Sequence, residues 1–273
     1  VDYENARGTF GGVKGTGSQS GTKVTGTSAD TASSGFRIVK STPTVKFVSL
    51  PTGTSLTGAS DKPLYRFSVT ASSKGPIGIS QLTLRVSTTS ATTIIDLLDN
   101  INVKVYTDSA YSVLASGLQT DGTMQATDLA LASVWASAST DLKIGAQTAA
   151  AASTTVQIPS GGTRYFEVIG DVTLSGGGAT YSVSTQLQGD ARFYSQLVPY
   201  TGATSTWSSF LATSTYFMDL GTGAQTDSNN FIWTPNSTTT ITNWTANDYL
   251  NGYGVSGLPA SNLTPQTLSD KAL

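Results

Sequence analysis

The strongest constraint on the fold is an alternation of apolar and polar residues that recurs between residues 36 and 187. Segments such as 64–70 (LYRFSVT), 101–106 (INVKVY) and 181–187 (YSVSTQL) have apolar side chains at every second position. A period of two directs one face of a strand toward a core and the other toward solvent, as in antiparallel sheets. Turn-forming Gly, Pro, Asp and Ser separate these segments. We therefore predict an all-β fold, an antiparallel β-sandwich of immunoglobulin or fibronectin type.

The alternation also predicts which side chains form the core. We expect the core to contain Val45, Phe47, Tyr65, Phe67, Val69, Leu82, Leu84, Val86, Val103, Val105, Phe166, Val168, Val183 and Leu187. Residues 123–152 break the pattern, because the alanines around Leu129 and in the run 149–152 favour helix over strand. For this interval we predict a loop with one or two helical turns, capped by Thr127 or Asp128.

Composition divides the chain into three parts. Residues 1–35 are rich in Gly, Ser and Thr, with too few apolar residues for a core of their own. We expect an extended arm that lies either on another subunit or on its own domain. Residues 36–192 form the predicted sandwich. Residues 193–273 carry many aromatic residues and few charges, which predicts either an irregular extended segment or a small second β module.

Low charge and two missing residue types exclude many functions. Only 12% of the residues are charged, the net charge is −2, and the chain has neither cysteine nor histidine. This balance argues against partners such as nucleic acid and anionic membranes. Disulfides, zinc–thiolate sites, thiol nucleophiles and histidine general bases are impossible in such a chain. The sequence also lacks the roughly 18 consecutive apolar residues of a membrane-spanning helix.

Catalytic constellations are equally scarce. Glutamate occurs only at Glu4 and Glu167, and the Ser-x-x-Lys match at Ser20 and Lys23 falls in the Gly-rich arm without its usual companion motifs. We therefore expect a protein that is not an enzyme and has no cofactor. Calcium remains an alternative at two groups of oxygen ligands, although the same residues are typical of turns. These groups are Asp96, Asp99 and Asn100, and Asp227, Asn229 and Asn230.

Three Asn-x-Ser/Thr sequons lie near the C-terminus. Asn236, Asn243 and Asn262 are the candidate glycosylation sites. In a chain this rich in Asn, Ser and Thr, such matches also arise by chance, and Pro265 follows the third directly. We interpret the three asparagines as candidates for exposed loops.

Several stretches resemble a known group of proteins. The stretches are 41–51 (STPTVKFVSLP), 64–71 (LYRFSVTA), 75–78 (GPIG), 230–237 (NFIWTPNS), 243–245 (NWT), 251–255 (NGYGV) and 257–259 (GLP). Together they resemble secreted, Ser/Thr-rich β-domain surface proteins of ultrasmall bacteria of the candidate phyla radiation. The resemblance extends over residues 40–265 with gaps, and it implies export, a cell-surface location and no catalytic residues. The opening Val1-Asp2-Tyr3 fits a terminus exposed by signal-peptide removal, or a fragment of a longer chain.

These observations predict a structural subunit of an extracellular, pilus-like filament. Identical subunits would polymerise by exchanging extended arms or strands. Candidate interface residues are the apolar and aromatic side chains of the two terminal segments: Tyr3, Phe10, Val13, Val24, Trp207, Phe210, Phe231, Trp233 and Trp244. The alternatives are an S-layer-like lattice protein and a surface adhesin that binds glycans on a host or neighbouring cell through its tail aromatics.

Overall fold

The computed structural model describes most of the predicted sandwich and parts of both terminal segments. The described residues are 14–16, 23–25, 39–94, 98–129, 135–174, 181–190, 230–236, 249–258 and 266–269. Contacts divide the chain into two units, residues 1–37 and 38–273. In the first unit, strands β1 (Lys14–Thr16) and β2 (Lys23–Thr25) pair antiparallel.

The first sheet of the larger unit has four antiparallel strands. They follow the order β3 (Pro43–Phe47), β4 (Ala59–Ala71), β9 (Thr163–Val172) and β6 (Leu98–Tyr106). Valine and aromatic residues occupy alternate positions of these strands, which suits a surface with one buried face. Phe67 and Phe166 lie opposite each other across β4 and β9, and their rings stack with centroids 4.8 Å apart.

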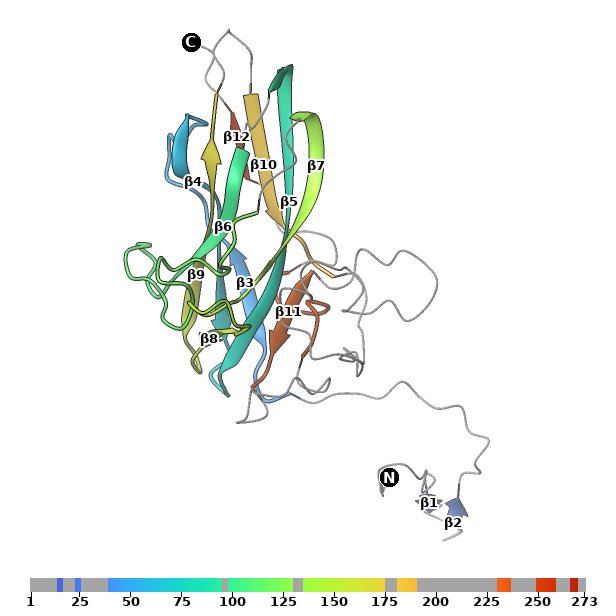
Figure 1. Cartoon of the computed structure of the whole chain (residues 1–273). Coiled ribbons are helices and arrows are strands. Elements are labelled where there is room, and N and C mark those ends of the chain that lie inside the picture. Colours follow the sequence, from blue (N-terminus) through green and yellow to red (C-terminus); the bar gives the residue numbers. More distant parts are fainter. Residues whose placement is uncertain are drawn as a thin grey trace. The chain divides into compact units, whose positions relative to one another are not determined.

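The second sheet is built around the long strand β5 (Ile77–Ile94), as Figure 1 shows. On one edge, β5 pairs with β7 (Trp135–Gly145) and β8 (Val156–Ile158). On the other edge it pairs with β10 (Tyr181–Leu187) and β11 (Phe231–Thr234), and β12 (Gln266–Ser269) continues the sheet beyond β10. All of these pairings are antiparallel. The only regular elements among the described residues are strands, so the fold there is all-β without any helix. No helix long and apolar enough to cross a membrane occurs in that part of the chain either.

The two larger sheets pack together over one hydrophobic core, an arrangement that is sandwich-like. Of the predicted core residues, thirteen are buried, whereas Phe47 is only partly buried and packs against the cluster from its rim. The alternation predicted the buried face correctly because each inward residue has inward neighbours across the ladder, such as Val103 with Val168.

The expected helical turns in residues 123–152 are absent from the described part of that interval. Residues 135–145 form strand β7, which pairs with β5 from Gln81 to Thr89. Leu142 and Ile144 alternate into the core. The prediction was wrong because ladder hydrogen bonds and core contacts with β5 outweigh the weak helix propensity of alanine.

Candidate functional site

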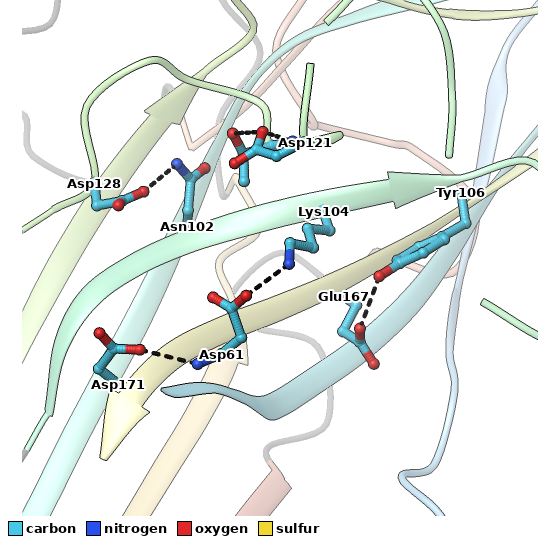
Figure 2. Close-up of polar contacts among 9 residues, drawn as sticks. Asp61, Asn102, Lys104, Tyr106, Asp121, Asp128, Glu167 and Asp171 are labelled. Atoms are coloured by element: carbon cyan, nitrogen blue, oxygen red, sulfur yellow. Dashed lines mark hydrogen bonds and ion pairs between the residues drawn. The ribbon is translucent and has the colours of Figure 1, made fainter. Parts of the chain in front are cut away.

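The outward face of the four-stranded sheet carries a network of polar side chains (Figure 2). Lys104 Nζ lies 2.8 Å from Asp61 Oδ2, and the backbone N–H of Asp61 donates to Asp171 Oδ1 at 2.9 Å. Asn100 Nδ2 donates to the other oxygen of Asp171 at 2.8 Å. Asp61 and Asn100 have φ values of 52° and 50° and lie where the register of β4 and β6 shifts against β9. Aspartate and asparagine tolerate this left-handed conformation better than other side chains.

A second polar group lies further along the same face. Arg66 contacts Glu167 through Nε at 2.8 Å and through its terminal nitrogen at 2.6 Å. The hydroxyl of Tyr106 donates to the other oxygen of Glu167 at 3.2 Å, and the Arg66 guanidinium lies 3.9 Å from the centroid of the Tyr111 ring. Burial raises the pKa values of Tyr106 and Tyr111 to about 12. Both tyrosines therefore remain neutral: Tyr106 donates a hydrogen bond to Glu167, and the ring of Tyr111 packs against Arg66 and Tyr106.

These polar groups hold strands together. Asp61, Asp171 and Glu167 each have a cation, an amide or a hydroxyl as partner. Within the residues described by the structure, no group of three acidic side chains is placed to hold a metal ion. Of the candidate calcium ligands, Asp99 accepts the backbone N–H of the next residue, Asn100, at 2.8 Å. Asn230 donates its backbone N–H to Asp190. Asp96, Asp227 and Asn229 lie outside the described residues.

The most unusual feature is the way two C-terminal segments cover the edges of both sheets. We call residues 230–236 and 249–258 the C-terminal clasp. Its strand β11 pairs with β5 at residues 78–82, directly beyond the point where β10 ends. All four residues of β11 are buried, with Phe231 and Ile232 at 0% and Trp233 at 4% exposure. The clasp therefore supplies part of the hydrophobic core.

The buried carboxylate of Asp190 holds the clasp by accepting hydrogen bonds from the backbone N–H groups of the clasp. Asp190 follows β10, and its Oδ1 accepts the N–H of Asn230 at 2.8 Å. Its Oδ2 accepts the N–H groups of Phe231 at 3.1 Å and Gly252 at 2.7 Å. Burial raises the pKa of Asp190, while the three N–H donors and the positive charge of Lys143 oppose that rise. The carboxylate thus joins both parts of the clasp to the end of β10.

The second part of the clasp connects the edges of the two sheets. Leu250 exchanges two backbone hydrogen bonds with Trp233, at 2.8 and 3.0 Å, on the outer side of β11. Further along, the carbonyl of Ser256 accepts the N–H of Val45 on β3 at 2.8 Å. The indole N–H of Trp233 donates to the carbonyl of Asn251 at 3.0 Å. The clasp therefore covers backbone groups of β11 and β3 that are otherwise open edges.

The structure places some of the predicted interface residues in this core. Phe231 and Trp233 lie on β11 and are buried within the chain's own sandwich. Val24 lies on β2, opposite Gly15. Asn236 has a φ of 50° and donates from Nδ2 to Gln157 Oε1 at 2.9 Å. The remaining predicted sites lie outside the described residues: Tyr3, Phe10, Val13, Trp207, Phe210, Trp244, Asn243 and Asn262.

The sequence did not reveal Asp190. It stands in Gln188-Gly189-Asp190, directly after an alternating strand, where glycine and aspartate are typical of an ordinary turn. Its role depends on backbone donors that lie 40 to 62 positions further along the chain, and no local spacing encodes such a contact. Comparison with protein-family models matches no family to this chain, and no curated protein matches it.

Proposed function

We propose that this protein is a structural subunit that polymerises with identical copies into an extracellular cell-surface filament. The observation that carries the proposal is β11, a short, wholly buried strand that completes the edge of β5 from a segment distant in sequence. A strand bound in this way is held by backbone hydrogen bonds and by pockets for alternate side chains, which is the chemistry of strand addition between proteins.

The low charge supports assembly rather than catalysis or nucleic-acid binding. A chain with 12% charged residues has few desolvation costs when its surfaces are buried against copies of itself. We interpret the fold as a sandwich of immunoglobulin or fibronectin type, whose edges serve polymerisation. The protein acts without enzymatic activity or cofactor, and export places it at the cell surface.

A glycan-binding adhesin is the weaker alternative. Of the aromatic residues proposed for stacking on sugar rings, Trp233 is buried, and its indole N–H is satisfied by a backbone carbonyl. Its ring is therefore not available to a ligand. An S-layer-like lattice uses the same self-assembly chemistry and differs from a filament only in the symmetry of its contacts.

Electron microscopy of the purified full-length chain tests the proposal. We expect filaments, or a two-dimensional lattice, at protein concentrations of about 1 mM, the range of local concentrations in which a tethered segment exchanges. Removal of residues 1–35 determines whether the N-terminal arm is needed for the contact. A chain that remains monomeric by light scattering under all of these conditions would contradict the proposal.

A further inference from the structure

We propose that the C-terminal clasp is exchanged between subunits. Residues 230–236 of one copy pair with β5 of the next copy, and Asp190 of that next copy accepts the backbone N–H groups of the clasp. This inference rests on the proposed function and identifies the partner, which is a second copy of this chain. Its first support is that the hydrogen bonds of Asp190 join two different parts of the chain. The acceptor Asp190 belongs to the sandwich, whereas all three N–H donors, from Asn230, Phe231 and Gly252, belong to the clasp.

A second support is that the receiving site is incomplete without the clasp. Residues 78–82 of β5 form backbone hydrogen bonds with β7 and β8 on one edge and with β11 on the other. Ile79 and Leu82 are fully buried, and both lie opposite β11 residues. An empty edge would expose these apolar side chains and a row of unpaired backbone groups. Each of the three buried apolar side chains of β11 contributes about 1.5–3 kcal/mol through burial.

A third support is the close fit between the site around Asp190 and the clasp. A Cβ atom at Gly252 would lie 2.9 Å from Asp190 Oδ2 and 2.8 Å from Leu258 Cδ2. The site therefore accepts a segment that has glycine at this position and a large aromatic residue where Phe231 enters the core. Within this chain, residues 230–258 supply both features. The site therefore matches the segment of this chain, which the same copy or a second copy can supply.

A fourth support is the length of the connection. Asp190 and Asn230, which this hydrogen bond joins, are 40 positions apart in the sequence. A connection of roughly 40 residues spans on the order of 130 Å when extended, far enough to reach an adjacent copy. Because the contacts are identical within one copy or between two, local concentration decides between them. A flexible tether gives an effective concentration on the order of millimolar, so exchange between copies is expected at comparable protein concentrations.

Introduced cysteines test the exchange cleanly because the chain contains none of its own. Gln81 and Ile232 are opposite each other in the β5–β11 ladder. We suggest preparing two single variants, Gln81→Cys and Ile232→Cys, mixing them at about 1 mM so that they assemble, and then oxidising the mixture. A disulfide between the two variants forms only if β11 of one copy lies on β5 of another. We expect heterodimers on denaturing gels, with the linked peptides identified by mass spectrometry.

Two double variants serve as controls. Gln81→Cys/Ile232→Cys, oxidised as a dilute monomer, shows that the geometry permits the disulfide within one copy. Ser87→Cys/Ser139→Cys joins β5 to β7, where the two hydroxyl oxygens lie 2.9 Å apart, and should link within one copy in every state. Assemblies without the mixed disulfide, from a pair that links in the monomer, overturn this inference alone. The absence of any assembly overturns the proposed function and this inference together.

Discussion

Asp190 places a carboxylate where three backbone N–H groups converge in the protein interior. Substitution Asp190→Asn keeps the shape but replaces one acceptor oxygen by an NH2 group that faces N–H donors. Hydrogen bonds to charged groups are worth more than neutral ones, and an unsatisfied buried donor costs about 1–3 kcal/mol. We expect Asp190→Asn to lower the free energy of unfolding by about 2–4 kcal/mol, measured by urea denaturation.

Asp141→Asn is the matched control. Asp141 pairs with Arg85 at 2.7 Å, but both side chains are 38% exposed, and pairs of this kind contribute about 0–1 kcal/mol. Equal losses in the two variants would show that the Asp190 contacts stabilise the fold no more than a half-exposed ion pair does, and would contradict this prediction.

Asp108 provides a prediction for pH. Its carboxylate accepts the N–H of Val113 at 2.7 Å and contacts Ser112 through both the N–H and the hydroxyl. The N–H of Val113 is the main cause that lowers the pKa of Asp108. A lowered pKa in the folded state means that the stabilisation is present above the unfolded pKa and is lost as the pH falls through the folded one. We expect the amide resonances of Ser112 and Val113 to shift below about pH 4.

Asp108→Asn should remove that acid transition while leaving spectra at neutral pH similar elsewhere. Persistence of the same transition in this variant would assign it to another carboxylate.

At the scale of elements, the alternation predicted several strands of the sandwich but missed others, among them β7. Period-two alternation identifies β4, β6 and β10 because each directs alternate apolar side chains into the core and places more polar ones on the opposite face. Strand β7 escaped because the alternation of Leu142 and Ile144 follows an alanine-rich stretch with weak strand propensity. Its structure is determined by pairing with β5. A local pattern carries no information about that partner.

The clasp offers a prediction at this scale through two glycines with left-handed backbones. Gly254 has a φ of 74°, and nothing lies near the position of an added Cβ. Gly257 has a φ of 79°, and an added Cβ would overlap the carbonyl oxygen of Val45. Gly254→Ala should cost about 1–2 kcal/mol of unfolding free energy for the backbone alone. Gly257→Ala should cost about 1–3 kcal/mol more, because the clasp must move away from β3.

Thermal unfolding of both variants checks this difference. Hydrogen exchange of the Val45 amide provides the structural readout, since that N–H donates to Ser256, and it should be faster in Gly257→Ala only. Identical stability and exchange in the two variants would show that the clasp does not depend on its contact with β3.

At the scale of the whole molecule, the described parts of the low-charge C-terminal region belong to the sandwich. For residues 193–273 the sequence predicted either an irregular extended segment or a small second β module. In the described part of that region, Phe231 and Trp233 lie on β11 and are buried in the sandwich. The sequence could not distinguish packing within one copy from exchange between two, because both use the same side chains and the same backbone bonds. Whether the clasp packs within one copy or on another depends on the protein concentration and on the length of chain between Asp190 and Asn230. The alternation of residues within a strand carries no information about either.

Assembly through the clasp should therefore respond weakly to salt. Its contacts are backbone hydrogen bonds, apolar side chains and the buried carboxylate of Asp190, and exposed ion pairs have no part in them. Raising sodium chloride from about 50 mM to about 500 mM shortens the screening length severalfold, which weakens contacts between exposed charges but not buried ones. We expect the critical concentration for assembly, measured by light scattering, to change by less than about twofold. A tenfold or larger increase would instead point to a contact between charged surfaces, such as the face that carries Lys104 and Asp61.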